Sequence, residues 1–179
     1  MPDGRTHDII TVVTAAAAVP ATLALPGMTP GQVGVLAGSY LLSGILFSCD
    51  LDLRSEPYLR WGRFRFIWWP YQKLLHHRAV WSHGLIIGPV LRIAYFTAMV
   101  FLLMYGGLAL INLLHPVDPS GTAMRVLLWL NGYLTRHSGV VLLALIGFIL
   151  GGASHTIADL LSTGYKNWRR RHPFLRRFL

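Results

Sequence analysis

The sequence is poor in charged side chains and has almost no cysteine. Asp, Glu, Lys and Arg make up 13% of its 179 residues, whereas hydrophobic residues make up 54%. This balance lies outside the usual range of soluble globular domains and indicates a membrane protein. Cys49 is the single cysteine, which excludes a disulfide framework and a zinc site built from several cysteines.

Acidic residues are also scarce, with 7 Asp and Glu against 16 Lys and Arg. The basic residues gather in residues 54–78 and 166–177. Clustering of this kind indicates how a chain is oriented in a membrane, and it does not favour a nucleic-acid partner. Residues 1–179 contain no repeat and no low-complexity linker, so we expect a single membrane-embedded helical domain.

Four apolar stretches are long enough to cross a bilayer core of about 30 Å as helices. Arg92 and Pro89 interrupt the third of them, so we place its first two turns at the membrane surface. A weaker apolar stretch, residues 126–134, is expected at the far interface. The predicted fold is an all-α polytopic membrane bundle with interfacial helices and about four spans, near residues 9–26, 32–48, 93–114 and 139–161.

Lys and Arg counts near the span ends predict the orientation. The loop over residues 53–83 and the tail over residues 166–179 hold most of these cations. Both termini and the central loop are therefore expected on the cytoplasmic side of a bacterial inner membrane. Aromatic and basic residues alternate in "WGRFRFIWWPYQK", which suits the headgroup region, and we interpret this segment as an ordinary amphipathic connector.

Histidine or aspartate residues, or both, lie at the cytoplasmic end of every span. The groups are His7 with Asp8, Asp50 with Asp52, the histidines of "HHRAVWSH" (His76, His77 and His83), and His155 with Asp159. The predicted topology was derived from Lys and Arg counts alone. The common membrane depth of these histidine and aspartate groups is therefore independent evidence that they form one site. Ionisable groups at membrane depth are costly unless they are paired or bind ions, so they mark functional sites.

Imidazole and carboxylate are the usual ligands of zinc, manganese and iron. Five or six of them could hold two ions about 3.5–4 Å apart. Ordinary alternatives exist for each group. His155 and Asp159 share a helix face and could be a hydrogen-bonded pair that holds two helices together. The segment "CDLDL" could be a helix end that turns into solvent, His7 alone would mean little, and one of His76 and His77 is expected to be only interfacial. Cys49 precedes Asp50 and could be a soft metal ligand, but we favour a reduced buried thiol. Gly34 with Gly38, and Gly147 with Gly151, have the spacing of close helix packing.

The motifs "GRTHD", "FSCDLDLRS", "RWGRFRFIWWPYQKLLHHRAVWSHG" and "GGASHTIADLLS" together resemble a family of uncharacterised bacterial membrane proteins described as metal-binding. More distantly, the chain is similar to membrane-bound metal-dependent hydrolases of the YdjM kind. The resemblance implies metal ligands at His7, Asp50, His77, His83, His155 and Asp159, with Asp8 and Asp52 as further ligands or supports. Departures from the hydrolase motifs, such as Leu53 after the second aspartate, weaken the transfer of hydrolytic activity more than that of metal binding.

Three functions follow from these observations. The first is a metal-dependent hydrolase acting on an ester or phosphoester, including a membrane lipid, with one or two divalent ions and zinc favoured over manganese or iron. In it, Arg78 stabilises developing negative charge and Asp52 assists catalysis. The second is a structural metal site in a non-enzymatic membrane protein, which predicts a closed coordination shell. The third, metal transport or sensing, is disfavoured because the far halves of the spans contain almost no ionisable residues.

Overall fold

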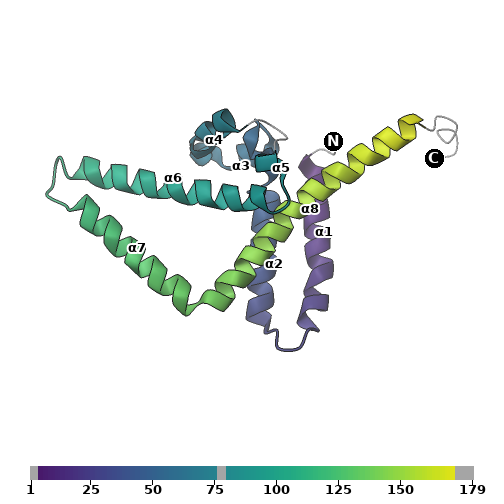
Figure 1. Cartoon of the computed structure of the whole chain (residues 1–179), viewed down its shortest axis with the longest axis horizontal. Coiled ribbons are helices and arrows are strands. Elements are labelled where there is room, and N and C mark those ends of the chain that lie inside the picture. The colour runs from purple at the N-terminus through teal and green to yellow at the C-terminus, as the bar shows by residue number, and fades with distance from the viewer. Residues whose placement is uncertain (1–3, 76–79, 172–179) are drawn as a thin grey trace.

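The structure, a computed structural model, describes residues 4–75 and 80–171. Within these ranges all regular elements are helices, which confirms the predicted all-α class (Figure 1). In chain order they are α1 (Gly4–Leu23), α2 (Pro30–Ile45), the 3₁₀ helix η1 (Cys49–Asp52), α3 (Glu56–Arg60), the 3₁₀ helix η2 (Gly62–Trp68), α4 (Trp69–Leu74), α5 (Val80–His83), α6 (Ile87–Ile111), α7 (Pro119–Arg136) and α8 (Ser138–Arg171).

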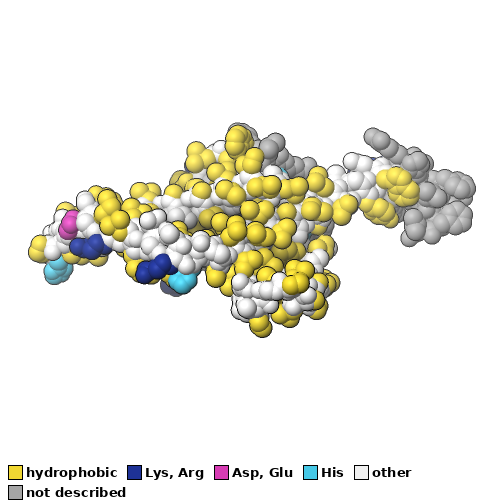
Figure 2. Space-filling model, turned by 60° about the horizontal axis from the view of Figure 1, so that its bottom comes forward, with side chains coloured by type: hydrophobic (Ala, Val, Ile, Leu, Met, Phe, Trp, Pro, Cys, Tyr) yellow, Lys and Arg dark blue, Asp and Glu magenta, His cyan; other side chains and the backbone are white. Residues whose placement is uncertain are grey.

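Four segments are long and apolar enough to cross a membrane: α1, residues 30–52, α6, and residues 138–168 of α8. Much of their apolar surface is exposed, as the hydrophobic side chains over the middle of the molecule show in Figure 2. The charged side chains in that view gather toward one end. Exposed apolar area on this scale requires a covering phase or partner.

Helices α1 and α2 form an antiparallel hairpin, and α8 packs across α2 (Figure 1). Gly27 makes the hairpin turn with a φ of 82°, which favours glycine, and Thr29 caps α2 through a reciprocal contact with Gln32. A Cβ at Gly147 or Gly151 would overlap the α2 backbone, so the predicted close packing of these two glycines is confirmed.

The other predicted packing pair, Gly34 with Gly38, behaves differently. A Cβ at either position would meet no described atom within 4 Å. These glycines of α2 therefore face away from the described helices, and the prediction that they pack closely is wrong for this part of the chain.

Helices α6 and α7 extend away from α1, α2 and α8, and α6 runs at a steep angle to α1 and α2 rather than alongside them (Figure 1). The expected bundle is therefore seen only for α1, α2 and α8. Among the described residues, none in α7 is buried. Arg92 does not interrupt the helix: α6 already begins at Ile87, Pro89 lies in its first turn where no backbone donor is needed, and Arg92 is fully buried.

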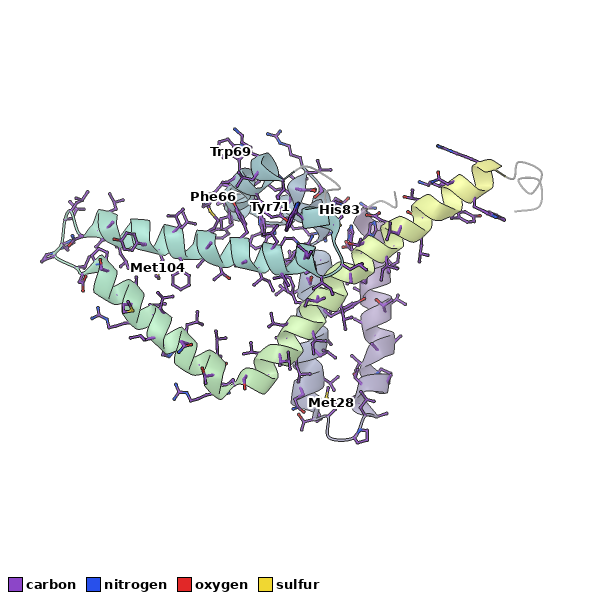
Figure 3. The ribbon with its side chains drawn as sticks, viewed as in Figure 1. Met28, Phe66, Trp69, Tyr71, His83 and Met104 are labelled. Atoms are coloured by element: carbon purple, nitrogen blue, oxygen red, sulfur yellow. The ribbon has the colours of Figure 1, made fainter. Side chains whose placement is uncertain are left out.

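The segment between α2 and α6 is folded into short helices around an aromatic core. Phe47, Trp68 and Tyr71 are buried there, and Trp68 contacts both Phe47 and Tyr71 edge to face. Phe66 and Trp69 point outward, whereas Tyr71 points inward (Figure 3). This core fixes the connector against the ends of α2 and α6, which positions η1.

Candidate metal centre

The motif Cys49-Asp50-Leu51-Asp52 forms η1 at the end of α2, and three side chains hold it there. Ser48 accepts a hydrogen bond from the Asp50 amide at 3.3 Å, and Ser55 donates one to the Asp50 carbonyl at 2.7 Å. Gln72 donates to the Leu51 and Leu53 carbonyls. Because the backbone of η1 is tied on both sides, its carboxylates and its thiol keep a defined direction.

Helices α1 and α8 bring two histidines face to face beside η1. The rings of His7 and His155 are stacked, with centroids 3.7 Å apart, and both residues are buried. Asp159 lies one turn beyond His155 on the same face of α8, as the four-residue spacing predicts. Its Oδ1 is 3.2 Å from Nε2 of His7, and its Oδ2 is 3.9 Å from Nε2 of His155.

Histidines and carboxylates alternate across the site. Asp50 lies between His155 and His83, because its Oδ2 is 3.3 Å from Nε2 of His155 and its Oδ1 is 3.9 Å from Nε2 of His83. Asp159 lies between His155 and His7 in the same way. Each carboxylate thus has one oxygen toward each of two imidazoles, so Asp50 and Asp159 would both be available as ligands to ions held by these histidines.

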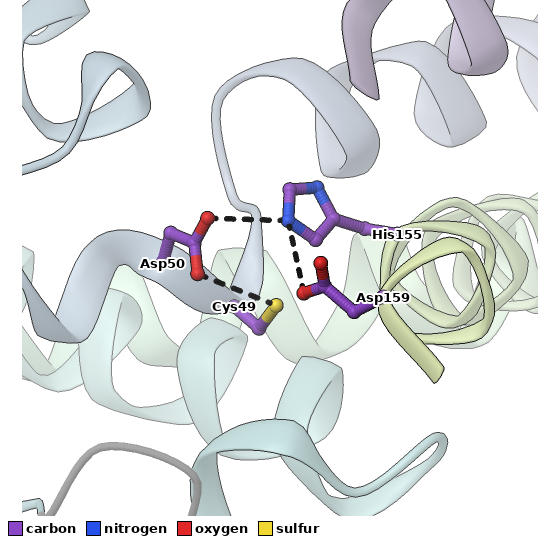
Figure 4. A group of neighbouring side chains, drawn as sticks. All are labelled: Cys49, Asp50, His155 and Asp159. Atoms are coloured by element: carbon purple, nitrogen blue, oxygen red, sulfur yellow. Dashed lines mark hydrogen bonds and ion pairs between the residues drawn. The ribbon is translucent and has the colours of Figure 1, made fainter. Parts of the chain in front are cut away.

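Cys49 also belongs to the site, whereas the sequence favoured a reduced buried thiol over a soft ligand at this position. Its Sγ and one donor atom from each of Asp50, His155 and Asp159 all lie within 4.8 Å of one another (Figure 4). We call these four residues together with His7, Asp52 and His83 the ligand cluster. Ligands 2.0–2.3 Å from a tetrahedral ion lie about 3.3–3.8 Å apart, so the separations of 3.3 and 3.9 Å around His155 fit such an ion.

Buried polar atoms in the cluster lack conventional hydrogen-bond partners. Neither oxygen of Asp159 accepts a well-directed hydrogen bond within the described residues, and Nδ1 of His7 and of His155 has no partner there. Unsatisfied buried groups are costly, so each calls for an explanation such as an ion. The donor set of imidazole, carboxylate and thiol therefore fits a divalent transition metal.

His83 of α5, labelled in Figure 3, and Asp52 of η1 pair with each other at another side of the cluster. Nδ1 of His83 is 3.9 Å from Oδ2 of Asp52, whose side chain is fully buried. Burial lowers the pKa of His83, but its contacts with Cys49 and the Asp52 and Asp50 carboxylates outweigh that effect, so the pKa lies above its ordinary value. A carboxylate behind a histidine in this way orients the ring toward an ion.

Arg92 is a neighbour of the cluster that sequence reasoning missed. Its guanidinium is fully buried and interacts with Cys49, Tyr71 and Asp52. A Cβ at Gly152 would lie 3.2 Å from this guanidinium, so the glycine leaves room for it. An arginine in an apolar run signals either a span boundary or a buried counter-ion, and the buried counter-ion is what the structure contains.

Asp8 does not face the cluster. Both of its oxygens accept hydrogen bonds from Arg60 of α3, and this contact joins the start of α1 to the connector. The hydrogen bond and the nearby charge raise the pKa of Arg60, against the smaller opposite effect of burial. His77 and Arg78, the remaining predicted site residues, and His76 lie outside the described residues.

A cavity of about 360 Å³ reaches the cluster. His83, Thr156, Asp159 and Thr163 line it, together with Gly84, Leu85 and Leu160. Thr156, Asp159 and Thr163 lie on one side of α8, since they are spaced by three and four residues. Two members of the cluster therefore border a space large enough for a small ligand.

These features define an all-helical metal-binding protein whose candidate site joins α1, η1, α5 and α8. The family model of the uncharacterised metal-binding proteins called DUF2227 matches residues 2–169, and the chain belongs to that family. A search of curated proteins gave no match, and neither did a search of solved structures. The similarity to YdjM-type hydrolases and the bacterial origin therefore stay predictions.

Proposed function

We propose that this protein is a membrane-embedded, metal-dependent hydrolase that acts on an ester or phosphoester at the cytoplasmic face of the membrane. The observation that carries the proposal is the cavity at the ligand cluster. His83 and Asp159 belong to the cluster and also line this cavity. A purely structural site closes its ligand shell, whereas a catalytic site keeps a position open to substrate.

Charge balance supports two divalent ions. Cys49, Asp50, Asp52 and Asp159 carry up to four negative charges when deprotonated. The buried Arg92 offsets one of these charges, and the remaining three exceed what one divalent cation neutralises. Asp50 and Asp159, each placed between two histidines, would offer carboxylate ligands to more than one ion. Zinc is the favoured metal because thiolate, imidazole and carboxylate are its usual ligands.

The residues around the ions would have separate roles in orienting ligands, binding substrate and balancing charge. Bound ions would supply Lewis acidity to the substrate and lower the pKa of water. Asp52 holds His83 in orientation from behind. Thr156 and Thr163 place hydroxyl groups along the cavity wall, where they can hydrogen-bond to substrate oxygens. Arg92 offsets negative charge at the buried side near Cys49, and Arg78 remains the predicted contact for an anionic substrate.

A structural metal site is the second candidate, and one observation favours it. The cluster draws residues from α1, η1, α5 and α8, so bound ions would tie four segments together. Ions that bind only the folded arrangement stabilise it, as in small zinc domains. This candidate predicts a large loss of thermal stability on metal removal and no hydrolysis of any substrate.

The test uses the protein purified in detergent without a polyhistidine tag. Its metal content is measured, and hydrolysis of bis(p-nitrophenyl) phosphate and of p-nitrophenyl butyrate is then followed before and after chelation and on adding back zinc or manganese. We expect hydrolysis of at least one of these substrates, which chelation abolishes and the metal restores.

The variant Asp159→Asn should abolish this activity because it removes charge from an oxygen pair shared by two histidines. The matched control is Asp118→Asn, since Asp118 caps α7 far along the chain from the cluster. Its activity should equal that of the unchanged protein. Full metal content with no hydrolysis of phosphoesters, esters or extracted membrane lipids would overturn the enzyme proposal in favour of the structural one.

A further inference from the structure

A second cavity, of about 370 Å³, lies between three helices, two of which carry His7, His155 and Asp159 of the ligand cluster. Its walls come from α1, α2 and α8, and we call it the tail groove. Small side chains make the space, notably Ala15 and Ala18 of α1, Ala37 of α2, and Gly147 and Ala153 of α8. Leu36, Leu150 and Ile157 supply further apolar surface.

The hydroxyl groups that line the tail groove are already engaged. Thr14 donates to the Ile10 carbonyl at 2.7 Å and is 2.7 Å from the hydroxyl of Tyr40. Thr22 donates to the Ala18 carbonyl at 3.0 Å, and Ser154 donates to the Gly151 carbonyl at 2.8 Å. Because these polar groups find partners within the protein, the groove offers a ligand mainly apolar surface.

The tail groove starts beside the ligand cluster. Along α1, His7, Thr11 and Ala15 are spaced by four residues and are all buried, so one helix face leads from the cluster to the groove. On α8, the groove residue Ser154 directly precedes His155. A ligand that filled the groove would therefore have one end close to the cluster.

We propose that the tail groove binds the hydrocarbon tail of a single amphiphilic lipid whose polar head lies at the ligand cluster. This inference rests on the proposed function and deepens it, because it assigns the hydrolase a lipid ester or phosphoester as substrate. The groove runs from the cluster between three helices that are apolar enough to span a membrane. A lipid in the cytoplasmic leaflet has its polar head at the membrane surface and its apolar tail toward the membrane centre, which is the order of the ligand cluster and the tail groove.

Photolabelling tests the assignment in the full-length protein. The probe is dodecyl phosphate with a diazirine in its tail, added to the protein in phosphatidylcholine nanodiscs, and labelled peptides are mapped by mass spectrometry. We expect labels on α1, α2 and α8 at groove positions, and we expect unlabelled dodecyl phosphate to suppress them. Labelling spread over α6 as strongly as over the groove would overturn the proposal, because α6 exposes apolar residues to any bulk lipid.

Two variants fill the groove from opposite walls: Ala18→Phe from α1 and Ala153→Phe from α8. Each should reduce groove labelling about tenfold, a typical effect of overfilling a packed apolar site. Ala17→Phe is the matched control, since Ala17 is the exposed neighbour of Ala18 and does not line the groove. Unchanged labelling in whichever groove variant folds, or an equal loss in the control, would refute the groove assignment.

Metal content measured on the same samples separates this inference from the proposed function. Groove labelling without bound metal would support the lipid site and reject the metal-dependent hydrolase. Full metal content with no groove labelling would reject the lipid site alone. Both results are read without an activity assay, so neither depends on having found the natural substrate.

Discussion

Replacing His155 by alanine removes the side chain at the middle of the ligand cluster. Its Nε2 is 3.3 Å from Asp50 and 3.9 Å from Asp159, and its ring stacks on His7. His155 thus contacts both carboxylates and the other buried histidine of the cluster. The substitution therefore deletes one ligand and leaves the two carboxylates without their shared imidazole.

The size of the effect can be estimated from the number of ligands. Four-ligand zinc sites bind with roughly 10–16 kcal/mol at neutral pH. One ligand of four is then worth about 3 kcal/mol, and the dissociation constant should rise about 100-fold in His155→Ala. We expect metal to be lost during gel filtration, whereas the unchanged protein retains about two equivalents.

The assay is elemental mass spectrometry of the purified protein, followed by competition with a chromophoric chelator to obtain the dissociation constant. His137→Ala is the matched control, because His137 ends α7 and contacts Tyr133 rather than the cluster. Full metal content and unchanged affinity in His155→Ala would refute the assignment of the cluster as the metal site. An equal loss in His137→Ala would point to a general effect of removing histidine.

Three further predictions concern packing, the role of Asp8 and pH. Gly151→Ala should destabilise the protein by about 1–3 kcal/mol, because the new Cβ would meet the Tyr40 carbonyl and the Ser43 side chain. The control Gly38→Ala should be neutral or stabilising by up to about 1 kcal/mol, since a Cβ there meets no described atom. Equal thermal midpoints of the two variants in detergent would contradict this packing. Asp8→Asn should keep its metal, because Arg60 engages both Asp8 oxygens; loss of metal would return Asp8 to the ligands. Burial raises the pKa of Tyr71 from 10.0 to about 12, so the folded state keeps the phenolic proton to a higher pH than the unfolded state does. This difference contributes about 3 kcal/mol of stability below pH 10, and that contribution should disappear as pH rises to 12. The free energy of unfolding, measured from pH 10 to 12, should fall less in Tyr71→Phe than in the unchanged protein. The same pH dependence in both proteins would refute the prediction.

Short-range patterns in the sequence were sufficient for the helices and for part of the site. Apolar length indicated the four candidate spans, and the four-residue spacing of His155 and Asp159 predicted their common face. Lys and Arg counts predicted that His7, Asp50, His83 and Asp159 lie at one end of their helices, and the structure brings these side chains together. Each inference used only residues within one helix or next to its end.

Features that depend on distant partners were not predictable in this way. Arg92 resembles a span boundary until the buried Cys49 and Asp52 are placed beside it. Asp8 is adjacent to His7, yet its partner Arg60 lies 52 residues away and turns it from the cluster. Cys49 gave a weak ligand signal alone, since a lone thiol is usually inert, and only the approach of α8 puts it with His155 and Asp159.

The all-helical class, the apolar helices and the gathering of histidine and aspartate at one end of them were therefore predictable from the sequence, because they depend on local periodicity and composition. The contacts among these residues, the direction of α6, and the places of the cavity and the tail groove became known with the fold. These depend on how helix faces pack, and packing is set by side-chain volumes at positions far apart in the chain, such as Gly151 against Tyr40.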